Sequence, residues 1–432
     1  MNLQNIKIHF IGCGGIGMLG LALMVLEKGA IVSGSDIEES KNTKLLKSLG
    51  ARVVIGKHEA LNIPSQNEPC IIIYSSAVKL DNPELLRARE LNYICYKRGE
   101  FLGILAKSFE TVISVAGSHG KTTVTSMITY VLLKAGLKPG YYIGGFPRGW
   151  EKNASCGNGK TLVAEADESD LSLNFLCPTV GIALNLDNDH AWNVGGLDKL
   201  HEGFKKYVFD SRIFLNGSEN FPEGFLEELK TNGIEFLERE NMQTGESLNS
   251  AEYNNLSTVV TVAGYFGITS QRTLDILKTF PGVERRMSRI FDSETLIVLE
   301  DYAHHPSEIN AVISQVKTKY SDRKLIVLFQ PHREKRLQFC FEAFVKELSK
   351  ADFVFILPVF GAWENTGKKL EEELKKAIGS KSRNISYDWN NSAFELSSFI
   401  KPEEKTLLML LGAGDINQII KPLVENLSWR FK

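Results

Sequence analysis

The sequence lacks the features of secreted, membrane-spanning and nucleic-acid-binding proteins. It has six cysteines in 432 residues and no C-x-x-C pair, so we expect neither a disulfide framework nor a zinc site. No apolar run approaches the roughly 18 residues of a membrane-spanning helix, and the first residues lack the pattern of a secretion signal. The net charge is −2 with no long run of one sign, which favours neither nucleic acid nor an anionic membrane as a partner. We therefore expect a cytoplasmic protein without membrane insertion that binds anions only at local sites.

The chain alternates between β-strand and α-helix patterns along its whole length. Its length predicts about three domains of ~150 residues each. Strands rich in β-branched residues, each followed by a turn and an amphipathic segment, predict an α/β fold with parallel sheets. We expect a Rossmann-like domain over residues 1–103, a phosphate-loop domain over 104–284 and a second Rossmann-like domain over 285–432. Residues 230–250 are polar and weakly patterned, and we expect an exposed excursion there.

A phosphate-binding loop is predicted between residues 111 and 123. A β-branched run, Thr111 to Val115, leads into a glycine turn and then a helical segment. Backbone N–H groups of such a turn converge on phosphate oxygens at a helix N-terminus, and the lysine adds a mobile positive charge. The strict eight-residue motif fails because Val115 stands where it requires glycine, so an ordinary glycine turn is the alternative. The predicted nucleotide-binding residues are Gly117, Ser118, His119, Gly120, Lys121, Thr122 and Thr123.

A second glycine-rich loop occurs near the start of the chain. The segment 12–17 matches G-x-G-x-x-G after a predicted strand, and Asp36 lies about 20 positions further on. Taken alone, this pattern indicates NAD. Another predicted strand ends at Ser75 and Ser76, at the same sheet edge. We expect this domain to bind a nucleotide at its strand ends.

Two acidic clusters follow predicted strands of the second domain. The first contains Glu165 and Glu168, and the second ends at His190. Mg²⁺ prefers carboxylate, hydroxyl and water ligands, so we expect Thr122, Glu165 and His190 to complete a magnesium site around ATP. A solvated acidic turn that caps the next helix is the alternative for the first cluster.

The third domain is predicted to carry basic and histidine residues at its strand ends. Arg286, at the predicted hinge, could neutralise charge on a transferring phosphate, or could be a hydrated linker residue. His332, Arg333 and Arg336 suit a carboxylate ligand, although each arginine could instead face solvent or pair internally. Five of the eight histidines fall at strand ends, which predicts a functional role for some of them: His119, His190, His304, His305 and His332. Two phosphate loops and a basic pocket describe an ATP-consuming enzyme acting on two phosphorylated molecules.

With these motifs assembled, the chain resembles the Mur ligase family of peptidoglycan synthesis, over nearly its whole length. The resemblance is to the branch that joins L-alanine to UDP-N-acetylmuramate, and it implies ATP and Mg²⁺ as cofactors. It implies that ATP phosphorylates the muramoyl carboxylate and that the amine of L-alanine attacks the resulting acyl phosphate. The motifs that carry it include residues 12–18, 33–36, 75–77, 117–123, 165–170, 185–190, 285–286, 301–308, 330–333 and 412–416.

The resemblance also implies roles for individual residues. Catalytic roles fall to Lys121, His190, Arg286 and His304, and ATP is expected to contact Asn254, Arg286 and Asp301 besides the phosphate loop. The amino acid is expected at His332, Arg333 and Arg336. The UDP-sugar, in place of NAD, is expected at Gly14, Gly15, Ile16, Gly17, Met18, Asp36, Ser75 and Ser76.

Departures from the family pattern leave more than one function open. Trp192 stands where the family has an acidic residue, and Ser257 replaces an asparagine of the adenine motif. These changes suggest, as an alternative, a catalytically impaired nucleotide-binding relative. The motifs are also compatible with a recycling ligase that attaches a tripeptide to the same sugar nucleotide, and the first glycine-rich loop with a dinucleotide-dependent oxidoreductase. The pattern does not predict the oligomeric state.

Overall fold

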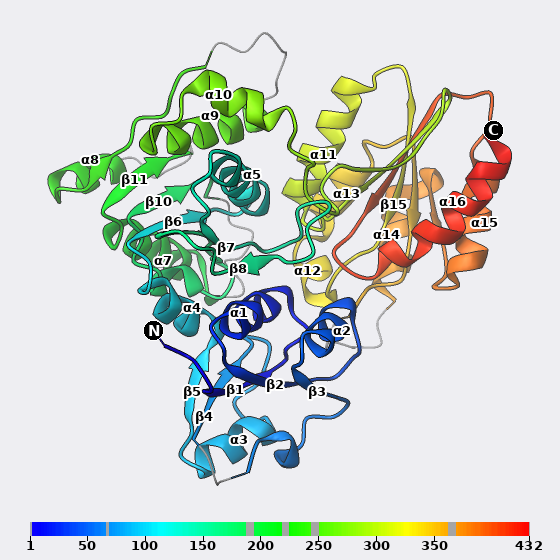
Figure 1. Ribbon diagram of the computed structural model, residues 1–432. Helices are drawn as coiled ribbons and strands as arrows, with labels where there is room; N and C mark the ends of the chain where they lie inside the picture. Colours follow the sequence, from blue (N-terminus) through cyan, green and yellow to red (C-terminus); the bar gives the residue numbers. More distant parts are fainter. Residues whose placement is uncertain are drawn as a thin grey trace. The chain divides into compact units, whose positions relative to one another are not determined.

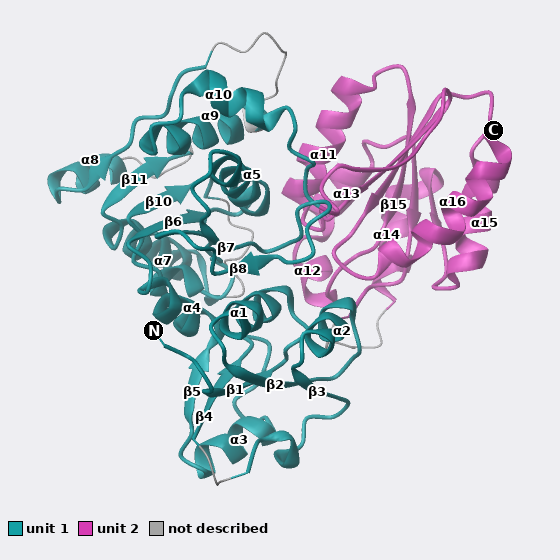
Figure 2. Cartoon of the chain, viewed as in Figure 1, with its two compact units in different colours: residues 1–283 teal, residues 284–432 magenta. Residues whose placement is uncertain are grey.

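The computed structural model describes residues 2–65, 69–186, 194–217, 224–242, 250–361 and 369–431. The chain forms three β-sheets with helices between the strands, as the alternation predicts (Figure 1). It divides into two compact units, residues 1–283 and 284–432 (Figure 2). The first unit contains two of the sheets, and the second unit contains the third. The α/β architecture is therefore confirmed, whereas the limits at residues 103 and 284 stay predictions.

The first sheet has five parallel strands in the order β3-β2-β1-β4-β5. Its strands are β1 Lys7–Ile11, β2 Ile31–Asp36, β3 Arg52–Ile55, β4 Cys70–Tyr74 and β5 Ile94–Lys97. Its helices are α1 Ile16–Glu27, α2 Lys41–Ser48, α3 Pro83–Glu90 and α4 Arg98–Ala106, with a short 3₁₀ turn at Ala60–Asn62. The register pairs Ile11 with both Ser35 and Tyr74, so the glycine-rich loop, Asp36 and Ser75 follow neighbouring strand ends.

The second sheet has seven strands in the order β12-β11-β10-β6-β9-β7-β8, parallel except for the β7–β8 pair. Its strands are β6 Thr111–Ala116, β7 Gly140–Tyr142, β8 Ala154–Ser155, β9 Thr161–Glu165, β10 Val180–Ala183, β11 Ile213–Asn216 and β12 Glu235–Phe236. Its helices are α5 Lys121–Lys134, α7 Leu197–Phe209, α8 Phe225–Thr231, α9 Ser250–Tyr265 and α10 Ser270–Leu277, with a 3₁₀ turn, η2, at Ser172–Phe175. Val115 pairs with Glu165 on one side and Ile182 on the other, which puts the phosphate loop between the ends of β9 and β10.

The third sheet has six strands in the order β13-β14-β18-β15-β16-β17, with only the β13–β14 pair antiparallel. Its strands are β13 Ser288–Asp292, β14 Leu296–Asp301, β15 Lys324–Phe329, β16 Phe353–Ile356, β17 Ser382–Asn384 and β18 Thr406–Leu411. Its helices are α11 Pro306–Lys319, α12 Glu334–Phe339, α13 Phe341–Leu348, α14 Leu370–Ile378, α15 Trp389–Phe399 and α16 Ile420–Arg430, with 3₁₀ turns at Gly379–Lys381 and Ile416–Ile419. Leu411 pairs with Asp301 and Phe329, so the loops after β14 and β15 flank the same strand end.

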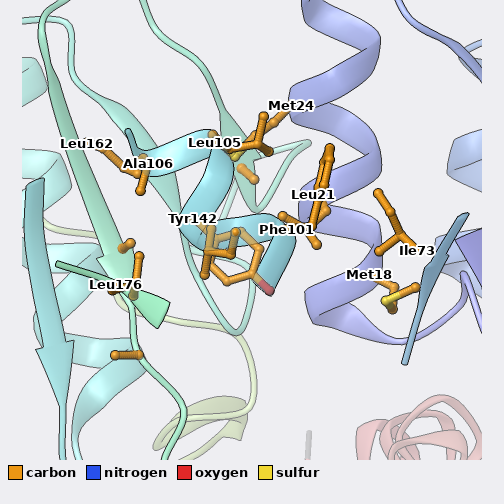
Figure 3. Close-up of a cluster of buried hydrophobic side chains, with 14 of the residues drawn as sticks. Met18, Leu21, Met24, Ile73, Phe101, Leu105, Ala106, Tyr142, Leu162 and Leu176 are labelled. Atoms are coloured by element: carbon orange, nitrogen blue, oxygen red, sulfur yellow. The ribbon is translucent and has the colours of Figure 1, made fainter. Parts of the chain in front are cut away.

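Buried side chains join the first two sheets into one core. Helices α1 and α3 lie on opposite faces of the first sheet (Figure 1). On the α1 side, Met24 and Leu21 belong to the same apolar cluster as Phe101 of α4 and Leu162 of β9 (Figure 3). Central strands such as β14 and β18 are buried along their full length, which is why residues 296–299 and 407–411 read as continuous apolar runs, whereas β14 ends at the buried charged residues Glu300 and Asp301. None of the helices in the described parts of the chain has the length and apolar character needed to cross a membrane.

Residues 230–241 are exposed or partly exposed, as expected for an exposed excursion, but the segment 230–242 also contains regular structure. It completes α8 and then forms β12, which pairs in parallel with β11 at the sheet edge. A strand of two residues is too short to show a period-two pattern, so no signal for it could be found in the sequence. The remainder of the expected excursion, residues 243–249, lies outside the described residues.

Candidate functional site

The phosphate loop joins β6 to α5 as predicted. Gly117 has φ of 133° and Gly120 has φ of 83°, values that side chains with a Cβ rarely adopt. The Asn185 amide fastens the loop to the end of β10, because its Oδ1 accepts from His119 N at 2.8 Å and its Nδ2 donates to His119 O at 2.9 Å. Gly120 is the N-cap of α5, so the first N–H groups of the helix have no capping side chain from that residue. The loop therefore has the backbone form of an anion-binding helix start.

Lys121 is held over this loop by an acidic partner. Its Nζ donates to Gly117 O at 2.6 Å and to Glu168 Oε1 at 2.9 Å, and lies 2.8 Å from Glu168 Oε2. Glu168 has no exposed side-chain surface, and Lys121 exposes 12% of its own. Burial lowers the pKa of Lys121, but the surrounding carboxylates outweigh burial and raise it overall. Burial raises the pKa of Glu168 to about 7, against the opposing effect of Lys121.

Thr122 and Glu165 form a second polar pair beside Lys121. The Thr122 hydroxyl donates to Glu165 Oε1 at 3.1 Å, and Gly144 N donates to Glu165 Oε2 at 2.8 Å. In the described parts of the chain, no group of three His, Cys, Asp or Glu side chains is placed to hold a metal ion. A hydroxyl beside one carboxylate nevertheless fits Mg²⁺, which keeps several waters and takes its remaining ligands from phosphate. His190 and Trp192, which the sequence places near this pair, lie outside the described residues.

The adenine-side prediction falls on helix α9. Asn254 lies on α9, which packs against α5. The next residue, Asn255, has its amide near the loop, because a Cβ built on Gly120 would lie 3.2 Å from Asn255 Oδ1. Ser257 is buried and donates to Glu240 O at 2.6 Å. The contact of Asn254 with the adenine side of ATP stays a prediction.

The glycine-rich loop of the first domain is closed by Asp36. Asp36 Oδ2 accepts from Gly14 N at 2.7 Å, and Asn42 Nδ2 donates to Gly14 O at 2.8 Å. Gly15 is the N-cap of α1, and Ile16 and Gly17 begin the helix. Met18 is buried in the core near Ile73, so only its backbone could face a ligand (Figure 3).

The loop after β4 lies beside the glycine-rich loop. Ser75 is close to Gly12, because a Cβ built on Gly12 would meet Ser75 Cβ at 3.2 Å, and Ser76 is exposed at the same loop. The structure thus brings together the loops of the predicted UDP-sugar residues.

A buried carboxylate, Glu84, connects four elements behind this loop and was not predicted. It accepts from Ser35 Oγ at 2.6 Å, from His58 Nδ1 at 2.8 Å and from Asn62 Nδ2 at 2.8 Å, and lies 3.3 Å from His9 Nε2. Burial opposes ionisation, but these four donors together hold the pKa of Glu84 well below its ordinary value. The local sequence, Asn-Pro-Glu, shows only an ordinary helix start, so the sequence carried no signal for this network.

Arg98, a second missed residue, connects the first sheet to the acidic loop after β9. Its guanidinium donates to Asp167 Oδ2 at 3.1 Å and to Asp170 Oδ2 at 2.7 Å. Burial raises the pKa of Asp167, but Arg98 and Lys121 outweigh it and lower the pKa to about 2. A charged residue at a strand-to-helix junction was the only available signal, and it does not identify partners so distant in the sequence.

In the second unit, the predicted amino-acid residues gather after β14 and β15. His304 and His332 have ring centroids 5.5 Å apart, and His332 stacks on Phe360 at 5.5 Å. Arg336 is buried on α12. Arg333, its N-cap, has φ of 67°, a strained value for a non-glycine residue, and its backbone N donates to Phe360 O at 2.9 Å. The structure therefore brings the three predicted amino-acid residues together with His304, which was predicted to be catalytic.

The two histidines of this cluster are neutral at physiological pH. Burial, with the nearby arginine charges, lowers the pKa of His304 to about 3 and that of His332 to about 2. His304 Nδ1 lies 2.9 Å from Tyr302 O, which can only accept, so Nδ1 carries the proton and Nε2 is an acceptor. Burial also lowers the pKa of Arg336. The positive charge of the cluster therefore comes from arginine.

Arg285, Arg286 and Asp301 lie at the start of the same unit. Arg285 is fixed in place, because it donates to Gly412 O at 2.7 Å and lies 2.9 Å from Glu300 Oε1. Arg286 is more exposed, with Nη1 3.7 Å from Glu308 Oε1. Asp301 is buried, and its two oxygens accept from the backbone N–H groups of Met287 and Ala303 at 2.8 and 2.9 Å. Contacts of Arg286 and Asp301 with ATP stay predictions.

Comparison with known proteins identifies relatives along the whole chain. Residues 7–110 match the model described as Mur ligase family, catalytic domain, and residues 285–414 match Mur ligase, glutamate ligase domain. A UDP-N-acetylmuramate–L-alanine ligase of Aquifex aeolicus is 36% identical over 98% of both chains. One of Caldicellulosiruptor saccharolyticus is 32% identical over 97% of this chain and 98% of its own. The crystal structure of UDP-N-acetylmuramate-alanine ligase MurC from Thermotoga maritima has a TM-score of 0.78 and 29% identity, and covers 99% of this chain and 100% of its own.

Proposed function

The chain belongs to the Mur ligase family, and we propose that it joins L-alanine to the carboxylate of UDP-N-acetylmuramate with ATP as the energy source. The carboxylate attacks the γ-phosphate of ATP, which gives an acyl phosphate and ADP. The amine of L-alanine then attacks the acyl carbon and expels phosphate. The product would be a precursor of peptidoglycan, made in the cytoplasm. The observation that carries this proposal is the convergence of the glycine turn, Lys121 and the Thr122–Glu165 pair at adjoining strand ends.

Lys121 and the phosphate loop would stabilise the phosphoryl transfer. Both the attacking carboxylate and ATP are anionic, so fixed donors must offset their repulsion. The loop would bind the phosphates through backbone N–H groups at the start of α5, other than the His119 N–H, which is donated to Asn185 Oδ1. Ser118, His119 and Thr123 would complete the loop. To reach a phosphate, Lys121 must exchange its contact with Glu168 for one with the nucleotide. Its position 2.6 Å from Gly117 O keeps it within the loop for that exchange.

Thr122 and Glu165 are the residues that would hold Mg²⁺. Their side-chain oxygens lie 3.1 Å apart, and both are ligand types that the ion prefers. When bound, Mg²⁺ supplies charge neutralisation on the phosphates. We propose His190 as a further ligand from the sequence pattern and the resemblance, because it lies outside the described residues.

The UDP-sugar is proposed at the first domain, where Asp36, the glycine-rich loop and the loop of Ser75 and Ser76 follow neighbouring strands. We propose that the start of α1, within residues 14–18, binds the diphosphate of this ligand. Asp36 Oδ2 accepts a hydrogen bond from Gly14 N and so fixes the loop. Its Oδ1 would accept a hydrogen bond from a hydroxyl group of the UDP-sugar.

The histidine and arginine cluster of the second unit is proposed as the amino-acid site. Arg333 and Arg336 suit the carboxylate of L-alanine, because a guanidinium binds a carboxylate through two donors. His304 would orient the amine through Nε2. With a pKa of about 3 it accepts a hydrogen bond from the amine but does not take its proton at neutral pH.

Release of ADP with defined substrates tests this function. We expect ADP only when UDP-N-acetylmuramate and L-alanine are both present with Mg²⁺ and ATP, and mass spectrometry should identify the alanyl product. Lys121→Met should abolish ADP release, whereas Lys134→Met, at the exposed end of the same helix, should preserve it.

Three outcomes would contradict the proposal. They are ADP release that needs neither substrate, turnover with a tripeptide in preference to L-alanine, and ATP binding without turnover on any amino acid. The second would indicate the recycling ligase, and the third would indicate an impaired relative.

A further inference from the structure

A mostly buried arginine joins the two proposed nucleotide sites of the first unit and has no part in the chemistry described above. Arg98 is the first residue of α4 and exposes 11% of its side chain. Through Nη2 it donates to Asp167, Asp170 and Ser172, at 3.1, 2.7 and 3.2 Å. Asp167 and Asp170 belong to the acidic loop, residues 166–171 between β9 and η2, which also supplies Glu168. Ser172 begins η2, and Glu165 is the last residue of β9. One end of Arg98 is therefore fixed to the acidic loop of the phosphate site.

The other end of Arg98 reaches the glycine-rich loop through Tyr142. Arg98 Nη1 donates to the Tyr142 hydroxyl at 3.1 Å, and that hydroxyl donates to Gly17 O at 3.0 Å. Figure 3 shows the Tyr142 ring between α4, which carries Phe101, and α1, which carries Leu21. An unbroken path of hydrogen bonds thus runs from the first turn of α1 to the acidic loop.

The residues of this path are closely packed against Gly17 and Gly99. A Cβ added at Gly17 would lie 2.7 Å from the Tyr142 hydroxyl and 3.0 Å from Arg98 Cδ. A Cβ added at Gly99 would lie 2.2 Å from Ser172 Cβ. Glycine at these two positions lets α1 and α4 approach the second sheet more closely than any other residue would permit. A shift of Arg98 must therefore move either α1 or the acidic loop.

We propose that Arg98 is a positioning residue that sets the glycine-rich loop in register with the acidic loop, and so aligns the carboxylate of the sugar nucleotide with the γ-phosphate of ATP. The inference rests on the proposed function, because it requires a substrate at each loop. Glu165 contacts Thr122 and Glu168 contacts Lys121, so the end of β9 and the acidic loop in turn position the phosphate loop. Reacting atoms must meet at about 3–3.5 Å, and a misplacement of about 1 Å can cost about 100-fold in rate.

Two conservative variants separate alignment from folding. Tyr142→Phe keeps the ring between α1 and α4 but removes both hydroxyl hydrogen bonds. Arg98→Lys keeps the charge beside Asp167 but cannot bond two carboxylates and a hydroxyl from a rigid fork. For each we expect kcat to fall by roughly 10- to 100-fold. The Kd values for Mg-ATP and for UDP-N-acetylmuramate, each measured alone by calorimetry, should stay within about threefold of wild type.

A matched control crosses the same junction away from this path. Lys152 pairs with Glu27 of α1 at 3.1 Å, with both side chains partly exposed. Lys152→Met removes a charge pair between the same two parts of the chain, and we expect unchanged kcat and unchanged Kd values.

The result that overturns the inference alone is an active wild-type enzyme whose two variants keep the wild-type kcat. Loss of both binding affinities together with a lower melting temperature would also overturn it, because that pattern shows a structural role. An equal loss of kcat in Lys152→Met would show that any weakening of the junction has the same effect, which removes the special role of Arg98. If the wild-type chain binds no UDP-N-acetylmuramate, the proposed function fails and the inference falls with it.

Discussion

The buried pair of Lys121 and Glu168 gives a prediction about how stability depends on pH. Burial raises the pKa of Glu168 from its ordinary value of 4.5 to about 7. The folded protein therefore keeps a proton over a range in which the unfolded chain has lost it. This stabilisation is complete below the unfolded pKa, about 4.5, and is lost as the pH rises through the folded pKa. Because a tenfold change in proton affinity is 1.36 kcal/mol, the loss amounts to about 3 kcal/mol.

Glu168→Gln should remove this pH dependence, because the amide of glutamine does not titrate. Mg-ATP identifies the unfolding transition of the domain that binds it, because it raises the melting temperature of that transition. The melting temperature of this transition is then measured without nucleotide from pH ~4.5 to ~7.5. Taking the predicted domain of residues 104–284 as the part that unfolds, 1 kcal/mol corresponds to roughly 2–4 °C in melting temperature. The difference in melting temperature, Glu168→Gln minus wild type, should therefore increase by roughly 6–12 °C as the pH rises from ~4.5 to ~7.5.

A control carboxylate of the same domain guards against a general effect of charge removal. Glu110 precedes β6 and pairs with Lys160 on the surface, where it is 65% exposed. Glu110→Gln should follow the wild-type pH profile. If Glu168→Gln also runs parallel to wild type, then Glu168 does not hold a proton in the folded state and the reasoning from its burial is wrong.

Two further predictions concern the first domain. Glu84→Gln should lower the stability of this domain by about 3 kcal/mol near pH 6, measured by its melting temperature, because a buried acceptor of four hydrogen bonds loses its charge. The pKa of Glu84 is strongly lowered from its ordinary value of 4.5, so in wild type this contribution is present above pH 4.5 and is lost as the pH falls through the folded pKa. An effect of the variant that does not depend on pH would contradict the assignment. Gly17→Ala should lower the free energy of unfolding by about 1–3 kcal/mol, because its Cβ would lie 2.7 Å from the Tyr142 hydroxyl. It should also weaken the binding of UDP-N-acetylmuramate. Gly15→Ala is the control for stability only, because Gly15 is itself a predicted UDP-sugar residue. Its Cβ would meet nothing nearer than 3.8 Å, and an equal loss of melting temperature in the two variants would contradict the packing argument.

The phosphate loop could be predicted because its parts are contiguous in the chain. A strand, a glycine turn and a helix occur between residues 111 and 134, and each has a local signal in the sequence. The acidic cluster at Glu165 could be placed beside it by topology alone, because parallel strands present their carboxyl ends at one edge. The pairing of Val115 with Glu165 confirms that step. Which carboxylate contacts Lys121 could not be predicted, because that depends on the course of the loop after β9.

The connections through Arg98 and Glu84 could not be predicted for a different reason. Arg98 lies 44 positions from Tyr142 and 72 from Asp170, and Glu84 lies 75 positions from His9. No spacing rule relates residues so far apart, and burial of a single charged side chain leaves no periodic pattern. The same limit applies to Gly17. The G-x-G-x-x-G pattern assigns it to a nucleotide, whereas the structure shows that its missing side chain also makes room for Tyr142.

Two carboxylates that are adjacent in the acidic loop, Asp167 and Glu168, have pKa values shifted in opposite directions. Arg98 and Lys121 lower the pKa of Asp167 to about 2, so it stays ionised at any physiological pH. Burial raises the pKa of Glu168 to about 7, so it can take up a proton when Lys121 leaves it. The difference arises because Asp167 lies between two cations, whereas Glu168 has the lysine as its largest opposing charge. The loop can therefore keep its attachment to Arg98 while it releases Lys121 to a phosphate, and both properties are needed if one loop is to hold two substrates in register during phosphoryl transfer.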